Sequence, residues 1–244
     1  MAPKLNVKIQ PLNYADMAAC ADIWRRDGYD MHSITRREYL GNLERKNMVF
    51  VKAVDVDVGN IVGYGGWVFP HVKQALIPWT GLADAKLQEQ ATETEAGDKV
   101  TQEPDSKREP DAIQRLHALE DEDMQYFQHK LIPAGEPCMI ALGLAVAPAP
   151  RSRGVGSALL GHGNAIADHL GLPIWVHSSH QAVDAYEKAQ VEPIRVLHLD
   201  LDEYAPRSPR DDEPVMSTKG SGKWGHYVIQ YMKREPREVN EETM

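Results

Sequence analysis

A basic, glycine-containing turn separates an apolar stretch, residues 142–147, from a helical pattern in the second half of the chain. The residues of this turn that could do chemistry are Arg151, Ser152, Arg153, Gly154 and Gly156. Glycine lets the main chain approach an anion closely, and the first turn of a helix has N–H groups without intrahelical partners. The turn therefore predicts a phosphate-binding loop.

Two common phosphate loops do not fit this turn. A P-loop needs Lys and then Ser or Thr after its last glycine, whereas Ser157 and Ala158 follow Gly156. The dinucleotide-binding fingerprint needs a third glycine, although Asp168 stands near the position of its acidic residue. The spacing that does fit is Arg-x-x-Gly-x-Gly, which begins at Arg151.

A second pattern lies farther along the chain, where Ser179 follows an apolar stretch and Tyr186-Glu187-Lys188 stand on a short helical segment. Together the two patterns resemble the two signatures of the GCN5-related N-acetyltransferases. Residues 138–190 carry the resemblance, and the rest of the chain agrees in the order of its strands and helices. The two signatures in this order are far more specific than either one alone.

The resemblance implies an acetyl-CoA-dependent acyltransferase that needs no metal. It implies cofactor contacts from Leu144, Ala145, Val146, Arg151, Ser152, Arg153, Gly154, Val155, Gly156, Ser157 and Ser179. The strand would pair with the pantetheine amides, the loop would hold the pyrophosphate, and a main-chain N–H near Val146 would hold the oxyanion. Two alternatives stay open: Arg151 or Arg153 as a surface cation without a partner, and Ser179 as a helix cap.

The resemblance also implies that Tyr186 is the general acid, because a phenol near the sulfur can protonate the leaving thiolate. A core tyrosine is the alternative. His177 is predicted as the general base, since it is the only titratable side chain on the preceding strand. His71 and Glu136 are rivals for that role.

The chain departs from the family after Lys188. Gln190 and Val191 replace the usual Gly-Phe, which predicts a differently built turn into the next strand.

The acceptor is expected to be a small, partly apolar amine. Aromatic side chains and one histidine stand on elements that border the acceptor cleft in the family: Trp24, Tyr29, His32, Trp67, Phe69 and Trp79. Core packing would explain them equally. Asp27 and Asp30 could hold an ammonium group or belong to a solvated turn.

The hydrophobic patterns predict strands and helices in the order of an α/β (α+β) fold. The resemblance implies that the strands form a central mixed, mostly antiparallel, splayed sheet flanked by helices. Strands are expected at 7–10, 48–56, 60–69, 139–147, 172–178, 193–201 and 224–232. Helices are expected after Asn13 and at 35–46, 111–132, 157–170 and 182–190.

We expect one domain over residues 1–244, interrupted by an insertion at 71–136. Within the insertion, the charged segment 81–110 is predicted to be a mobile loop and 111–132 a helix, because the former has too few apolar side chains to form a core. Residues 206–222 are predicted to form a flexible loop and 235–244 a frayed tail.

Composition excludes several classes of partner. A net charge of −9 disfavours nucleic acid and anionic membranes. No apolar run or N-terminal signal sequence stands out, and Cys20 and Cys138 are expected to be buried, reduced thiols, so a cytoplasmic protein is expected. A homodimer is left open. The alternatives to a small-molecule N-acetyltransferase are a peptide or protein N-acetyltransferase and a non-catalytic CoA-binding protein.

Overall fold

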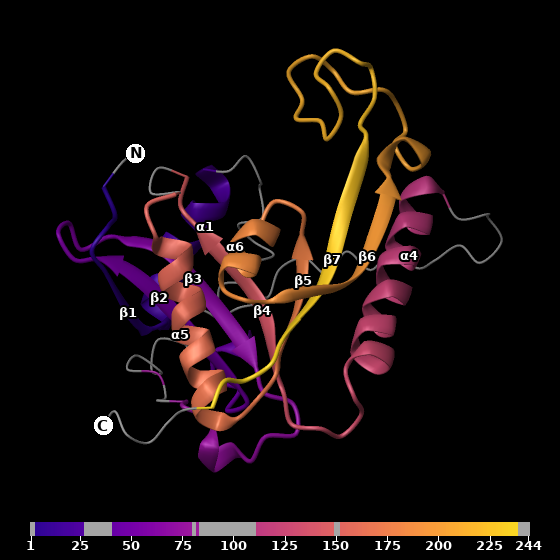
Figure 1. Cartoon of the computed structure of the whole chain (residues 1–244). Coiled ribbons are helices and arrows are strands. Elements are labelled where there is room, and N and C mark those ends of the chain that lie inside the picture. Colours follow the sequence, from indigo (N-terminus) through magenta and orange to yellow (C-terminus); the bar gives the residue numbers. More distant parts are fainter. Residues whose placement is uncertain (1–2, 27–40, 80–81, 83–110, 149–151, 239–244) are drawn as a thin grey trace.

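A seven-stranded mixed sheet forms the centre of the molecule (Figure 1). The computed structural model describes residues 3–26, 41–79, 82, 111–148 and 152–238. The strands are β1 (Val7–Pro11), β2 (Met48–Asp55), β3 (Ile61–Val68), β4 (Met139–Val146), β5 (Ile174–Ser179), β6 (Glu192–Asp200) and β7 (His226–Arg234). Their order across the sheet is β1-β2-β3-β4-β5-β7-β6, and β4 and β5 are the parallel pair. The predicted mixed, mostly antiparallel sheet is confirmed.

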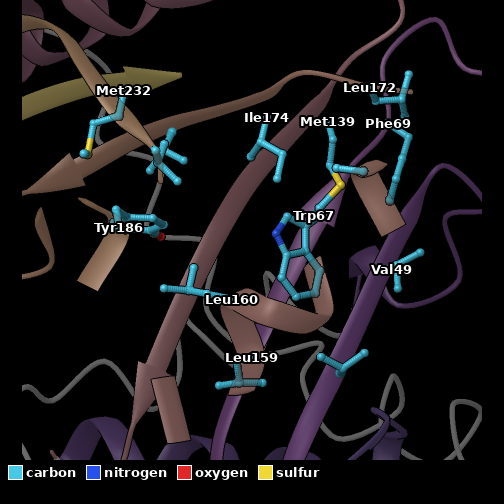
Figure 2. Packing of buried hydrophobic residues seen from close by; sticks show 14 of the residues in the cluster. Val49, Trp67, Phe69, Met139, Leu159, Leu160, Leu172, Ile174, Tyr186 and Met232 are labelled. Atoms are coloured by element: carbon cyan, nitrogen blue, oxygen red, sulfur yellow. The ribbon is translucent and has the colours of Figure 1, made fainter. Parts of the chain in front are cut away.

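Helices cover both faces of this sheet. Helix α1 (Met17–Arg26) packs on one face, here called the α1 face, against a cluster that includes Phe50, Tyr64 and Ala145. Helices α5 (Val155–Leu170) and α6 (Val183–Lys188) pack on the opposite face of the sheet, here called the α5 face. Trp67 and Met139 lie in the core on this face (Figure 2).

The insertion contributes helix α4 (Ala112–Tyr126), which continues as a π-helical turn, Phe127–Leu131. The carboxylate of Asp111 caps it by accepting a hydrogen bond from the N–H of Gln114 at 2.8 Å. Phe127 packs with Trp175 and Tyr231, so α4 and its π-helical turn pack on the α1 face of β5, β7 and β6. Figure 1 shows α4 alongside β6.

The sheet is splayed between β4 and β5. Only Met139 with Ile174 and Ile140 with Trp175 are paired across these strands, and beyond them the strands diverge (Figure 1). On its other side, β4 stays paired with β3 as far as Val146, with a bulge at Leu142. The diverging part of β4 therefore has a neighbour on one edge only.

Most element boundaries agree with the predictions. The clearest difference is at β7, which begins at His226 rather than at Trp224, because the N–H groups of Trp224 and Gly225 donate to the carboxylate of Asp202 instead of to a strand. Residues 27–40, which hold the first half of the helix expected at 35–46, lie outside the described residues, as do 83–110 and 239–244. Of the described half, residues 41–42 are helical and 43–46 are not, so that helix ends earlier than predicted.

The segment 206–222 has no helix or strand, as expected, but polar contacts hold its course. Glu213 accepts hydrogen bonds from the guanidinium of Arg207 at 2.6 and 2.7 Å, and the indole N–H of Trp224 donates to the carbonyl of Arg207 at 2.6 Å. Its flexibility remains a prediction.

Both cysteines are buried free thiols, as expected. Burial raises the pKa of Cys20 to about 12 and that of Cys138 to about 11, so both stay protonated. Among the described residues, no helix combines the length and apolar character needed to cross a membrane.

Candidate functional site

The predicted phosphate loop opens directly onto helix α5. Gly154 is the N-cap with φ +90°, a left-handed conformation that glycine adopts without strain, and Ser152 is also left-handed at φ +61°. The first intrahelical bond runs from the N–H of Ala158 to the carbonyl of Gly154 at 3.0 Å. The N–H groups of residues 155–157 therefore have no intrahelical acceptor and can bind an anion.

The N-terminal segment braces this loop. The N–H of Leu5 donates to the carbonyl of Arg153 at 3.0 Å, and the Nε–H of Arg153 donates to the carbonyl of Pro3 at 2.9 Å. A Cβ on Gly154 would lie 2.9 Å from Cε of Lys4, so the lysine stem lies against the loop. Arg153 is thus not a surface cation without a partner. Arg151 lies outside the described residues.

The edge of β4 that faces β5 offers main-chain groups to a ligand. The N–H of Ala147 donates to Val62, and the carbonyl of Ala145 lies against β3, where a Cβ on Gly63 would be 2.8 Å from it. The main-chain N–H and carbonyl groups of successive residues in a strand point to alternate edges. Leu144 and Val146 therefore direct these groups toward the gap between β4 and β5. Ala145 directs its own groups toward β3.

The loop and this edge are adjacent. A Cβ on Gly156 would meet the side chains of Val146 at 3.8 Å and Leu144 at 4.0 Å, which is ordinary contact. An anion on the first turn of α5 and a chain along β4 can therefore belong to one ligand.

Tyr186 lies on α6 in the core of the α5 face, with 7% of its surface exposed. Figure 2 shows it in the same cluster as Leu160, Ile174 and Met232. Burial raises the pKa of its phenol to about 12, so the hydroxyl keeps its proton. Near neutral pH the phenol is therefore available as a proton donor.

The turn after Tyr186 corrects one expectation. Gln190 is left-handed at φ +64°, as glycine would be, and its N–H donates to the carbonyl of Glu187 at 2.8 Å. The N–H of Val191 donates to the carbonyl of Tyr186 at 3.0 Å. These two bonds form a Schellman motif, so the turn keeps the geometry expected of glycine although glutamine stands there. The prediction of a differently built turn was wrong.

His177 lies on β5 with its side chain on the α1 face. Its ring meets that of Tyr231 edge-on, with centroids 5.2 Å apart, and lies 6.0 Å from that of Phe127. Burial lowers the pKa of His177, and the charge of Asp123 opposes that change. The side chains of Tyr186 and His177 thus lie on opposite faces of the sheet, and His177 stands on the part of β5 that diverges from β4.

Ser179 ends β5, and its carbonyl accepts a hydrogen bond from the N–H of Ala182 at 3.0 Å. Ala182, not Ser179, is the N-cap of α6, so the alternative of a capping serine is wrong. The rival bases His71 and Glu136 are exposed and stand at the end of β4 opposite the loop, where the N–H of Cys138 contacts the carbonyl of Pro70.

The residues expected around the acceptor are not gathered into one wall. Trp67 and Phe69 are core residues on the α5 face, 3% and 1% exposed, and a Cβ on Gly163 would lie 2.5 Å from the indole of Trp67. Of the two interpretations left open for these residues, core packing is the one that the structure supports. Tyr29, His32, Asp27, Asp30 and the side chain of Trp24 lie outside the described part of the chain.

Trp79 borders an apolar cavity of about 220 Å³ between β1, β2 and α5. His162 and Ile166 of α5 close one side of it, and burial lowers the pKa of His162. The cavity lies on the β1–β2 side of the sheet, away from the gap between β4 and β5.

The splayed sheet, the strand–loop–helix after β4 and the flanking helices define the fold of the GCN5-related N-acetyltransferases. Arabidopsis thaliana NAA60, solved in complex with a bisubstrate analogue, is similar at a TM-score of 0.51 and 13% identity, over 96% of this chain and 100% of that one. No protein-family model and no curated protein matches the sequence.

Two further solved structures are similar at a TM-score of 0.49. One is the histone acetyltransferase HPA2 and related acetyltransferase from Corynebacterium glutamicum, at 17% identity over 98% of this chain and 99% of that one. The other is the Escherichia coli ribosomal-protein-S18-alanine N-acetyltransferase, at 12% identity over the same shares of the two chains.

Sequence reasoning missed two parts of the site. Pro3 to Leu5 brace the loop from about 150 positions away, and Asp123 of the insertion helix lies near His177. Neither has a local signal in the sequence. Lys4 is one exposed lysine, and Asp123 is one of several acidic residues on its helix.

Proposed function

We propose that the protein is an acetyl-CoA-dependent N-acetyltransferase that acetylates a primary amine of a small molecule. The observation that carries the proposal is the continuity of three features. An anion-binding helix N-terminus adjoins the free edge of β4, His177 stands on β5 across the gap with its side chain on the α1 face, and Tyr186 lies on the α5 face.

The residues present fit the cosubstrate. The N–H groups of residues 153–157 would hold its pyrophosphate, with Arg151 and Ser152 beside them, and Leu144 and Val146 would pair with its amides. Ser179 would lie near the sulfur. When bound, acetyl-CoA supplies an acetyl thioester, which is the electrophile.

The protein groups then divide the proton transfers. His177 takes the proton from the acceptor ammonium, directly or through a water molecule, on the α1 face. The free amine attacks the thioester carbonyl, and a main-chain N–H of β4 stabilises the oxyanion. When the carbon–sulfur bond breaks, the hydroxyl of Tyr186 gives its proton to the thiolate from the α5 face, while the new amide nitrogen loses its extra proton to solvent, from which Tyr186 regains one.

A small acceptor is favoured by the position of α4. This helix packs on β5, β7 and β6 through Phe127 and its neighbours, so the part of the α1 face beyond His177 is covered. A long peptide would have to lie across that part of the sheet, whereas a small amine needs only the space beside the gap.

The test is release of the CoA thiol from acetyl-CoA by the whole protein, with a panel of small primary amines and with peptides. We expect release that depends on a small amine and that falls in Tyr186→Phe, with Tyr204→Phe as the matched control. Release with peptides alone would replace the small-molecule proposal, and binding of acetyl-CoA without any transfer would leave a non-catalytic CoA-binding protein.

A further inference from the structure

A buried, half-satisfied carboxylate lies on the sheet-facing side of the insertion helix. Asp123 is 6% exposed, and its Oδ1 accepts a hydrogen bond from Nη1 of Arg195 at 2.8 Å. Its Oδ2 has no hydrogen-bond partner among the described residues. A buried carboxylate oxygen without a donor is rare in proteins, because burial removes it from water.

Tyr231 and Phe127 connect Asp123 with His177. The hydroxyl of Tyr231 donates to the carbonyl of Asp123 at 3.4 Å, and the ring of the same tyrosine meets His177 edge-on. Phe127 stands one helical turn after Asp123, donates its N–H to the same carbonyl, and places its ring 6.0 Å from that of His177. The carboxylate and the imidazole thus belong to one packed cluster.

We propose that Asp123 is a positioning residue for His177, which it keeps in place through this cluster and whose protonated form it stabilises by its buried negative charge. The inference rests on the proposed function, in which His177 accepts the proton of the acceptor amine. An imidazolium ring carries a positive charge and a second N–H donor, and both interact favourably with a carboxylate that is incompletely paired.

Asp123 is the charged group that raises the pKa of His177, and the other charged or polar groups nearby either offset it or are exposed. Arg195 of β6 pairs with Asp123 and lies over the rings of Tyr126 and Tyr231, 4.4 and 5.0 Å from their centroids, so it offsets part of the carboxylate charge. Tyr231 of β7 contributes its ring and its hydroxyl to the same cluster. His129 and Lys130, later in the same helix, are exposed to solvent.

The experiment uses Asp123→Asn, which keeps the size of the side chain, and Arg195→Gln, which leaves a shorter polar side chain; each removes one charge. The pKa of His177 is measured by NMR titration of its imidazole in the full-length protein. We expect Asp123→Asn to lower that pKa and Arg195→Gln to raise it, each by about 0.5–1. Arg195→Lys, which keeps the charge, is the control, and thermal unfolding checks that each variant is folded.

Changes of opposite sign in the two variants support the proposal, since loss of packing alone would not reverse direction. No change in Asp123→Asn, or changes of the same sign, would overturn it. The pH dependence of kcat/KM gives the second readout: its rising limb should follow the NMR value in each variant. If the rising limb of the kcat/KM profile stays at the same pH while the pKa of His177 measured by NMR changes, the positioning role in catalysis is overturned. An absence of transfer in the wild type would instead refute the proposed function.

Discussion

The main-chain N–H of Val191 donates to the carbonyl oxygen of Tyr186 at 3.0 Å and thereby closes helix α6 around the proposed general acid. Val191 is 2% exposed and packs in the same cluster as Tyr186, so the hydrogen bond and the hydrophobic contact of the motif occur together. The position of the phenol is therefore set by the end of its own helix.

Gln190→Gly should raise the free energy of unfolding by about 0.5–1 kcal/mol. Gln190 is left-handed at φ +64°, which costs a residue with a Cβ about 1–2 kcal/mol, and the entropy that glycine loses on folding offsets part of the gain. Urea unfolding measures the change. Gln190→Ala is the control and should show no such gain, while an equal gain in both variants would contradict the left-handed assignment.

Tyr186→Phe should lower kcat by about 10²- to 10⁴-fold and leave acetyl-CoA affinity unchanged, because only the proton donor is lost. Burial raises the pKa of Tyr186 to about 12, so the acid stays protonated well above the ordinary tyrosine pKa of about 10. The wild-type rate should consequently not fall between pH 9 and about pH 10. A pH–rate profile that declines there in the wild type would argue against Tyr186 as the acid.

Asp168→Asn should lower the free energy of unfolding by about 3 kcal/mol near pH 7. The carboxylate of Asp168 pairs with the guanidinium of Arg234 at 2.7 and 2.8 Å, and the arginine side chain is only 4% exposed, so the variant leaves a buried charge unpaired. Asp121→Asn, an exposed position on α4, is the control and should change stability by less than about 0.5 kcal/mol.

The same pair gives a pH dependence of known sign. Partial burial acts to raise the pKa of Asp168, but hydrogen bonds from Arg234 and from the N–H of Arg237 outweigh it and hold that pKa below its ordinary value. The contribution of the pair is then complete above the unfolded-state pKa of about 3.9 and is lost as the pH falls through the lower folded-state value. Denaturant unfolding of wild type and Asp168→Asn should converge in acid; a constant difference would contradict the ion pair.

The loop and the helices could be predicted because their signals are local. Gly154 and Gly156 follow an apolar strand and precede a helical period, and the structure places the helix start at Val155, two residues before the prediction. The order of elements followed from the hydrophobic patterns, whereas the splay followed from the resemblance, since no hydrophobic pattern shows where two parallel strands separate.

The acceptor side could not be predicted from patterns. Six consecutive residues of β3, from Val62 to Trp67, are buried, so the burial of Trp67 does not tell which face it occupies. The contact of Asp123 with Arg195 joins residues 72 positions apart, and that of Arg153 with Pro3 joins residues 150 positions apart. Such contacts depend on how the insertion helix and the N-terminal segment pack, which no local spacing encodes.

Calorimetric titration of acetyl-CoA into wild type, Gly156→Asp and Gly161→Asp tests the central claim most directly. A Cβ fits at Gly156 without a clash, and an acidic residue in the first turn favours a helix, so Gly156→Asp should fold normally. Gly161 lies farther along α5 in open space and controls for the added charge.

We expect tight binding by wild type and Gly161→Asp, and a loss of about 100-fold or more in Gly156→Asp, since like charges in contact cost several kcal/mol. Equal affinity in all three proteins, or no binding by the folded wild type, would contradict a pyrophosphate site at the start of α5.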